Sequence, residues 1–374
     1  MTTAVIAGYV RSPFTLANKS PMAAVRPDEL AALVVRALVE RSGVTPDHIE
    51  DLLLGCAFPE GEQGLNMARL VGLMADLPRS VAAATINRFC GSSMQSVHSA
   101  AGAVSMGAGE VFICAGVESI SRVPMMGFNP LPHPVFAKEH PEAYLGMGDT
   151  AENVARQWKI GRAEQEKFAL ESQKRAAAAQ AAGKFKDEIV AIKETAEDGC
   201  LRPDTTLEGL AGLKLAFDEK GSVTAGTSSP LTDGAAALLV TSEEYARKHK
   251  LDILARIKAI SVAGCAPEIM GIGPVAATRK ALQRAGLDIG ALDVIELNEA
   301  FAAQSLACIA DLKLDPAKVN IDGGAIALGH PLGATGARIV GKAAQILKRE
   351  KGKYALATQC IGGGQGIATI LEAV

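Results

Sequence analysis

The sequence ALVERSGVTPDHIEDLLLGCAF at residues 37–58 has a counterpart, ALQRAGLDIGALDVIELNEAF, at residues 281–301. Each starts with Ala-Leu in a segment of helical period, reaches a glycine (Gly43 and Gly286), and ends in a short apolar run closed by Ala-Phe. A glycine after the last helical residue is typical of helix ends, and a short apolar run is typical of a buried strand. We interpret the pair as an internal duplication, which predicts two similar α/β halves.

Further apolar runs extend this pattern along the chain. Strands are predicted at 4–10, 51–58, 82–89, 111–116, 236–241, 255–264, 294–297, 319–321 and 354–357. Helical periodicity occurs at 28–41, 92–106, 275–285 and 334–349. Strands that alternate with helices predict a largely parallel sheet covered on both faces.

The middle of the chain differs from both halves. Prolines cluster after residue 118, and a charged, alanine-rich helix is predicted at 162–182. Insertions of this size on a rigid scaffold often carry binding. We therefore predict an N-terminal half at 1–117 with 233–252, an inserted loop domain at 118–232, and a C-terminal half at 253–374.

Composition excludes several classes of function. The net charge of -3 gives no general attraction to nucleic acid or anionic membrane, and 4% aromatic residues give no evident base-stacking surface. The N-terminal residues lack a basic signal-peptide region, and no apolar run is long enough for a membrane span. The seven cysteines form no CxxC pair, so we expect a protein of the reducing cytoplasm.

The first candidate residue is Cys90, in the sequence NRFCGSSMQ at 87–95. A strand is predicted to end before it and a helix to begin within Gly-Ser-Ser. Unpaired N–H groups at a helix N-terminus favour a thiolate and hold a developing oxyanion. The motif alone also fits a small buried cysteine followed by an ordinary serine cap.

The second candidate is His330, in GGAIALGHPLGATG at 323–336. Five glycines let the backbone turn sharply and approach a ligand, and the proline after the histidine fixes an extended geometry. No Gly-Lys-Ser/Thr follows, which disfavours a nucleotide P-loop. The other five histidines lie in predicted helices or polar loops and are expected at the surface.

Two further candidates follow predicted strands. Cys360 lies in TQCIGGGQG at 358–366, and Asn298 directly follows the strand at 294–297. Ligands of doubly wound sheets bind outside the carboxyl ends of strands, so Cys90, Asn298, His330 and Cys360 are expected to form one site. A metal site made by two cysteines and a histidine is the alternative, disfavoured because no two ligands are close in sequence.

These residues resemble the thiolase family over the whole length of the chain. The matching segments are 11–13, 87–95, 116–119, 150–153, 224–229, 298–301, 323–336 and 360–366. Two cysteines combined with Asn-Glu-Ala-Phe and Gly-His-Pro separate thiolases from the related ketoacyl synthases, which lack the second catalytic cysteine.

The resemblance implies a five-layered αβαβα fold of two similar halves with an inserted loop domain. It implies that Cys90 is the nucleophile, that His330 activates it, and that Cys360 is the acid/base for the substrate α-carbon. Asn298 would hold a water that forms one oxyanion hole with His330. The N–H groups of Cys90 and Gly362 would form the other.

The resemblance also places the substrate. Arg202 and Ser229 match coenzyme A contacts of the loop domain, and Met147 matches a residue near the acyl pocket. Coenzyme A is then a substrate, and no metal or other cofactor is expected.

Three positions depart from the family pattern. Asp322 replaces an asparagine common before Gly-Gly, and a turn-favouring residue remains there. Gly146 replaces a histidine common among members that form acetoacetyl-CoA, and Pro230 replaces a smaller residue. These departures bear on substrate detail and leave the reaction type unchanged.

The resulting hypothesis is thiolytic cleavage of 3-oxoacyl-CoA to acetyl-CoA and a shortened acyl-CoA in fatty acid β-oxidation, through an acyl-Cys90 intermediate. The CGSSMQ sequence resembles degradative 3-ketoacyl-CoA thiolases. An acetoacetyl-CoA thiolase of biosynthetic type is the first alternative, and a non-catalytic lipid- or CoA-binding relative is the second. We further expect a homodimer or homotetramer, with a β-oxidation multienzyme complex as a possible assembly.

Overall fold

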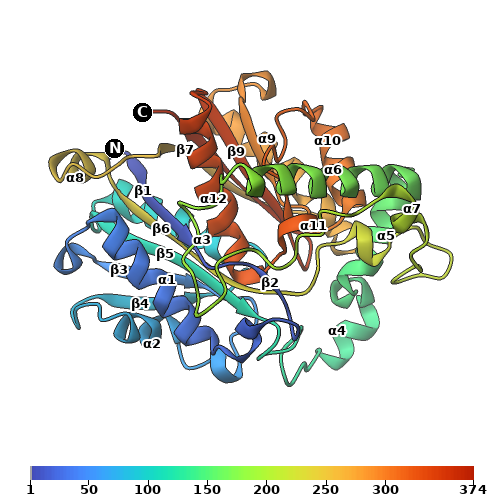
Figure 1. The fold of residues 1–374 in the computed structure, drawn as a ribbon, viewed down its shortest axis with the longest axis horizontal. Coiled ribbons are helices and arrows are strands. Elements are labelled where there is room, and N and C mark those ends of the chain that lie inside the picture. The colour runs from blue at the N-terminus through green and yellow to red at the C-terminus, as the bar shows by residue number, and fades with distance from the viewer. Residues whose placement is uncertain (1) are drawn as a thin grey trace.

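The computed structural model describes residues 2–374, so Met1, at the start of the predicted N-terminal half, lies outside the described residues. The chain forms one mixed sheet of ten strands in the order β4-β3-β5-β6-β1-β7-β10-β9-β8, with β2 beside β6 (Figure 1). The strands are β1 Ala4–Arg11, β2 Thr15–Leu16, β3 Asp51–Gly55, β4 Ala82–Ile86, β5 Val111–Ser119, β6 Thr232–Ser242, β7 Ala255–Gly264, β8 Val294–Leu297, β9 Tyr354–Ile361 and β10 Gln365–Glu372. The helices are α1 Pro27–Ser42, α2 Met67–Met74, α3 Ser92–Met106, α4 Pro134–Glu139, α5 Met147–Gln157, α6 Arg162–Ala181, α7 Leu207–Ala211, α8 Glu243–Lys248, α9 Gly273–Ala285, α10 Ala302–Leu312, α11 Ala325–Leu328 and α12 Leu332–Arg349.

The sheet consists of two halves with the same pairing pattern. In β3-β5-β6-β1 the first pair is parallel and the next two are antiparallel, and β8-β9-β10-β7 repeats this order. The halves meet where β1 pairs with β7 through two residue pairs, Val5 with Arg256 and Ile6 with Ala255. The duplication predicted from the sequence is confirmed.

The duplicated segments end their helices in the same way. Gly43 after α1 has φ of 69° and Gly286 after α9 has φ of 66°, the left-handed region that a residue without Cβ adopts without strain. A short 3-10 turn follows each glycine, at Pro46–His48 and Ile289–Ala291, before β3 and β8 begin. The two segments therefore pass from helix to strand through the same succession of elements.

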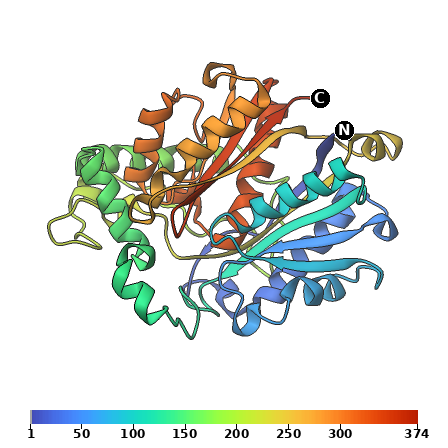
Figure 2. The same ribbon diagram turned by 180° about the vertical axis from the view of Figure 1, so that it is seen from behind.

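Five layers result from this arrangement. Helices α3 and α12 pack against each other, and between them they contact strands of both halves of the sheet. Helices α1 and α2 cover the outer face of the first half, and α9 covers that of the second half, with α10 packed against it. Figures 1 and 2 show α12 in the middle with the outer helices on either side. The αβαβα fold is confirmed, and its central helix layer leads to the candidate residues.

The expectation of a largely parallel sheet is wrong. In the described part of the chain, only β3-β4, β3-β5 and β8-β9 are parallel strand pairs. Strand β10, absent from the sequence prediction, turns back from β9 through Gly362, Gly363 and Gly364, where Gly363 and Gly364 have φ of 78° and 83°. The glycine run after Cys360 is therefore a hairpin turn, which requires an antiparallel neighbour.

Residues 319–321 are not a strand, contrary to expectation. Val319 makes only an isolated bridge to Ile295. The side chain of Asn320 accepts from the N–H of Leu297 at 2.9 Å and donates to its carbonyl at 2.8 Å. A side-chain amide thus takes the place of a neighbouring strand at the end of β8.

Between β5 and β6 the chain forms helices α4 to α7 and connecting segments. The helix predicted at 162–182 is confirmed as α6, which packs against α10 and α11. The three-part division of the chain stays a prediction. No helix among residues 2–374 is both long and apolar enough to cross a membrane.

Candidate active site

Cys90 lies in a tight turn between β4 and α3. The preceding Phe89 has φ of 42°, a conformation that costs a non-glycine residue about 1–3 kcal/mol. Hydrogen bonds hold it there: the Phe89 N–H donates to Asn87 Oδ1 at 2.9 Å, and the Ser92 hydroxyl donates to the Phe89 carbonyl at 2.6 Å. The turn holds Cys90 just before the N-terminus of α3.

His330 occupies the equivalent position before α12. Near their N-termini the two helices are in close contact, because the Ala337 N–H donates to Ser93 Oγ at 2.8 Å and a Cβ on Gly336 would lie 2.2 Å from the Met94 nitrogen. Only glycine permits this approach. Cys90 and His330 each precede their helix by two residues, so helix packing brings both to the same end of the central layer.

The surroundings of His330 define its tautomer. Its Nδ1 lies 2.6 Å from Thr335 Oγ1, and that hydroxyl donates to the Pro331 carbonyl at 2.9 Å. Because a hydroxyl has one hydrogen, Thr335 accepts from Nδ1–H, and Nε2 carries the free lone pair. Burial, with a smaller effect from Arg338, lowers the pKa of His330 to about 3. The imidazole is therefore neutral, with Nε2 available as a base.

The thiol of Cys90 is protonated in this structure. Burial raises its pKa to about 11, although hydrogen bonds from the N–H groups of Gly362 and of Cys90 itself act in the opposite direction. The expectation of a thiolate stabilised by the helix N-terminus is wrong for this state, because loss of hydration outweighs those hydrogen bonds. Both N–H groups predicted to form an oxyanion hole reach the sulfur.

Cys360 lies on β9 and is fully buried. Burial raises its pKa well above the ordinary value, and Cys90 adds to this effect. The N–H of Gly362, two residues further along the chain, reaches the Cys90 sulfur and so connects the two cysteines. The side-chain amide of Gln359 donates to the Cys90 carbonyl and connects β9 to the turn before α3. The apolar cluster around Cys360 consists of Met147, Ala151, Val223, Met270, Ala300 and Phe301.

Asn298 follows β8 and faces the histidine. Its Nδ2 lies 3.4 Å from His330 Nε2, and its backbone N–H donates to the Thr358 carbonyl at 3.0 Å. Within residues 2–374 its buried Oδ1 has no hydrogen-bond partner. This oxygen can accept a hydrogen from a water or a substrate beside His330.

Of the residues predicted to contact substrate, Met147 packs against the apolar cluster around Cys360, and Ser229 is hydrogen-bonded to Ala300 of that cluster. A Cβ on Gly362 would lie 3.4 Å from Met147 Sδ. The Ser229 hydroxyl and N–H both donate to the Ala300 carbonyl, at 3.1 and 3.0 Å, beyond the end of β8. Arg202 is exposed, and its N–H donates to Gln173 Oε1 at 2.9 Å. Their roles toward coenzyme A stay predictions.

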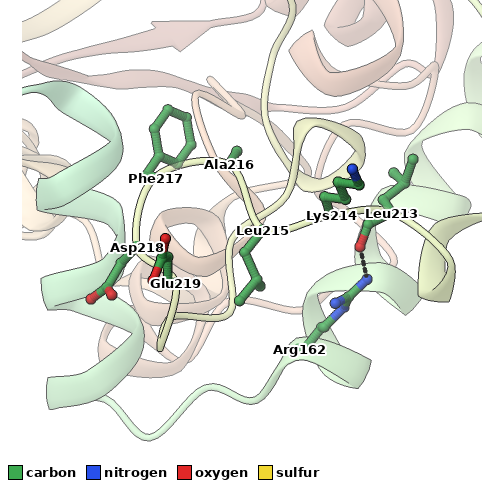
Figure 3. A pocket seen from close by; sticks show the side chains of 8 residues that line it. All are labelled: Arg162, Leu213, Lys214, Leu215, Ala216, Phe217, Asp218 and Glu219. Carbon is green, nitrogen blue, oxygen red and sulfur yellow. Dashed lines mark hydrogen bonds between the residues drawn. The ribbon is translucent and has the colours of Figure 1, made fainter.

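A cavity of about 470 Å³ lies in the inserted segment (Figure 3). Arg162 donates to the Leu213 carbonyl at its edge, 2.7 Å away. The Phe217 ring lies 5.9 Å from that of Phe301, so the cavity adjoins the apolar cluster around Cys360. It is lined by Arg162, Leu213, Lys214, Leu215, Ala216, Phe217, Asp218 and Glu219.

Several functional side chains were missed by the sequence analysis. Thr335 and Gln359 lie inside quoted motifs, but nothing in the sequence indicates their partners. Glu118 is buried and accepts from the N–H groups of Ala57 at 2.8 Å and Gly333 at 2.9 Å, which connects the two halves beside the site. The sequence signal that could have identified Glu118 is the matching segment at 116–119, Gly-Val-Glu-Ser.

One histidine prediction is wrong. His98, expected at the surface, is buried on α3, where its Nε2 lies 2.9 Å from Thr369 Oγ1. Its side chain faces β10, on the side of α3 away from the partly exposed Gln95, Ser99 and Gly102. Among residues 2–374, no group of three or more histidine, cysteine, aspartate or glutamate side chains is arranged to hold a metal ion.

Known proteins match the chain over its full length. The family models described as thiolase, N-terminal domain, and thiolase, C-terminal domain, match residues 4–244 and 251–373. The 3-ketoacyl-CoA thiolases of Bacillus subtilis (strain 168) and Vibrio cholerae serotype O1 (strain El Tor Inaba N16961) are 44% and 47% identical, with 100% of each chain covered.

Solved structures agree with these matches. Human mitochondrial 3-ketoacyl-CoA thiolase superposes with a TM-score of 0.92 at 38% identity, covering 100% of this chain and 99% of that one. The Bacillus anthracis acetyl-CoA acetyltransferase superposes with a TM-score of 0.93 at 41% identity and the same coverage. The chain therefore belongs to the thiolase family.

Proposed function

We propose that this enzyme cleaves 3-oxoacyl-CoA with coenzyme A, yielding acetyl-CoA and a shortened acyl-CoA, as a degradative thiolase of fatty acid β-oxidation. The observation that carries this proposal is that two buried thiols, Cys90 and Cys360, and a neutral His330 with an unprotonated Nε2 come from element ends that the helix and strand contacts bring together. One thiol suffices for acyl transfer, whereas breaking a carbon–carbon bond also needs an acid for the departing carbanion. The relatives named above as 3-ketoacyl-CoA thiolases support the same reaction.

In the first half-reaction, the sulfur of Cys90 attacks the 3-keto carbon as His330 Nε2 takes the thiol proton. The bond between carbons 2 and 3 then breaks, and its electron pair passes to the enolate of acetyl-CoA. The thiol of Cys360 protonates carbon 2, acetyl-CoA leaves, and the remaining acyl group stays as a thioester on Cys90. At this point Cys360 is a thiolate and His330 is protonated.

In the second half-reaction, Cys360 takes the proton of an incoming coenzyme A thiol. The coenzyme A sulfur attacks the acyl carbon, and the Cys90 sulfur leaves with the proton of His330. Both cysteines and the histidine return to their starting protonation states. The raised pKa of both thiols suits this cycle, because each is a proton donor at rest.

Developing negative charge on oxygen needs fixed donors in both half-reactions. The N–H groups of Cys90 and Gly362, which point at the sulfur, serve the acyl oxygen on Cys90. A water held by Asn298 Oδ1, together with His330, serves the thioester oxygen of the enolate. Loss of one such donor commonly lowers kcat by about 10²–10³-fold.

Substrate binding is assigned to the inserted segment and its surroundings. Arg202 and Ser229 contact coenzyme A, and Met147, beside Gly362 and the Cys360 cluster, lines the acyl pocket. Coenzyme A serves as substrate, and no other cofactor is needed, because every proton in the cycle has a side-chain donor and acceptor.

A cleavage assay tests the function directly. The enzyme is incubated with coenzyme A and either acetoacetyl-CoA or 3-oxooctanoyl-CoA, and acetyl-CoA and the shortened acyl-CoA are measured by mass spectrometry. Both substrates should be cleaved by the enzyme and neither by Cys90→Ala. Cleavage of the four-carbon substrate alone would favour the acetoacetyl-CoA thiolase alternative. The structural match to the Bacillus anthracis acetyl-CoA acetyltransferase is the observation that favours this alternative. Absence of both cleavages would overturn the proposal.

A homodimer in the cytoplasm is the proposed minimum assembly. Strand β4 is an edge of the sheet and is only partly covered, and α2 beside it exposes Leu70, Leu73 and Met74. An exposed edge strand next to apolar side chains favours pairing with another chain. A fully active monomer in light scattering at micromolar concentration would refute the dimer. A homotetramer or a β-oxidation multienzyme complex would require a further surface.

A further inference from the structure

A buried ion pair lies behind the active site, between the two elements that carry its imidazole and its amide. Arg338 on α12 donates from Nη1 to Oε2 of Glu296 on β8, at 3.1 Å. Arg338 follows Thr335, the partner of His330, by three residues and is its neighbour on the helix surface. Glu296 precedes Asn298 by two residues along β8. The pair therefore connects the supports of His330 and Asn298.

This ion pair is incompletely hydrogen-bonded. Arg338 Nε and Nη2, Glu296 Oε1 and the hydroxyl of Tyr9 are all buried and have no partner within residues 2–374. Tyr9 packs on the same helix, since a Cβ on Gly341 would lie 2.2 Å from its ring. A buried ion pair with unpaired donors contributes little net stability, and apolar replacement of such a pair is often neutral or stabilising. Stability alone is thus a poor explanation for Arg338.

We propose that Arg338 is a positioning residue for the active site. Its bond to Glu296 fixes α12 against β8, so that Thr335 holds the His330 ring opposite Asn298. Its positive charge adds to the effect of burial, which is the larger cause that disfavours protonation of the imidazole. The catalytic part of this inference rests on the proposed thiolase reaction, whereas the effect on the protonation of His330 does not.

The charged and titratable groups around Arg338 support this assignment. Besides burial, the charge of Arg338 lowers the pKa of His330, whereas the charge of Lys342, one helical turn further on, is engaged elsewhere. Lys342 pairs instead with Glu188 at 3.0 Å and Asp322 at 3.3 Å. The other charged groups that act on Tyr9 or Glu296 are Arg11 on β1, Glu188, Glu299, Asp322 and Lys342.

Lys342 supplies a matched control. It is a buried cation on the same helix, and both of its partners keep another cation when it is removed: Glu188 keeps Arg11 at 2.8 Å, and Asp322 keeps Lys184 at 3.0 Å and Arg349 at 2.7 Å. Lys342→Met therefore removes a buried charge from α12 but leaves the bond between Arg338 and Glu296 in place.

The experiment compares wild type with Arg338→Met/Glu296→Leu, Arg338→Lys and Lys342→Met. The thermal unfolding temperature, kcat and KM for coenzyme A, and the titration of His330 by NMR of ¹³C-labelled histidine are measured for each. His330 is one of six histidines, so its resonance can be assigned by its loss in His330→Asn.

The double variant should unfold near the wild-type temperature, lose kcat by about tenfold or more with little change in KM, and titrate His330 at higher pH. Arg338→Lys should keep the wild-type titration of His330, because the charge remains, and lose part of kcat, because the geometry changes. Lys342→Met should match wild type in kcat and titration.

A folded double variant with wild-type kcat and wild-type titration would overturn the inference. If the double variant does not fold, an unchanged kcat in Arg338→Lys would overturn the positioning role. A wild-type enzyme that cleaves no 3-oxoacyl-CoA refutes the proposed function instead, and the titration of His330 then still tests the effect of the Arg338 charge.

Discussion

Thr335→Val tests the tautomer of His330 with the smallest change in shape. Valine is close to threonine in size but lacks the hydroxyl that accepts from Nδ1–H at 2.6 Å and donates to the Pro331 carbonyl at 2.9 Å. The side chain is fully buried, so water does not readily replace it. Leaving a buried donor unpaired costs about 1–3 kcal/mol. A loss of that size leaves a protein of typical stability folded.

The catalytic effect should be much larger than the effect on stability. Without an acceptor at Nδ1, the proton can move to Nε2, provided that the Asn298 amide turns its oxygen toward the ring in place of Nδ2. Nε2 then no longer accepts the thiol proton of Cys90, and general-base assistance of about 10²–10⁴-fold is lost. Thr335→Ser keeps the hydroxyl and should remain within a few-fold of wild type.

The assay is single-turnover acylation of Cys90 by acetyl-CoA, followed by mass spectrometry of the intact protein. Circular dichroism and thermal unfolding establish that each variant is folded. A folded Thr335→Val enzyme that acylates Cys90 within about threefold of the wild-type rate would refute the assignment of Nε2 as the base.

Four further predictions concern the thiols and the substrate. Cys90→Ala should show no acetylation from acetyl-CoA, whereas Cys360→Ala should still be acetylated at Cys90. Cys360→Ala should, however, exchange the acetyl-CoA methyl protons with deuterated solvent about 10²–10⁴-fold more slowly than wild type. Exchange within a few-fold of the wild-type rate would contradict the role of Cys360. Because burial raises the pKa of Cys90 to about 11 and alkylation needs the thiolate, iodoacetamide inactivation should keep accelerating up to pH 10, and a plateau near the ordinary thiol range would contradict that burial. Peptide mapping should find Cys90 labelled before Cys56, Cys114 and Cys265, and first labelling elsewhere with activity intact would count against it. The kcat/KM for the eight-carbon substrate should lie within about tenfold of that for the four-carbon substrate, and a larger drop, above about 1.4 kcal/mol, would favour the acetoacetyl-CoA thiolase alternative.

The sequence predicted the parts of the fold that depend on local pattern. Helical periodicity located α3, α6, α9 and α12 within a few residues, and the glycines that end α1 and α9 revealed the duplication. The direction in which strands pair could not be predicted from local sequence pattern. Strand β10 was missed because its partner is chosen by the turn at Gly362–Gly364, and the antiparallel pairs of β6 join strands far apart in the chain.

By itself the sequence determined the residue types of the site and their positions at element ends, which is why Cys90, Asn298, His330 and Cys360 were found together. Tertiary structure decided the protonation state of Cys90 and the tautomer of His330. Burial overcame the helix N-terminus and left Cys90 a thiol, and Thr335 fixed which nitrogen of His330 is the base. Protonation depends on hydration and on partners brought together by packing, and these appear only when the two halves of the chain close around the central helices.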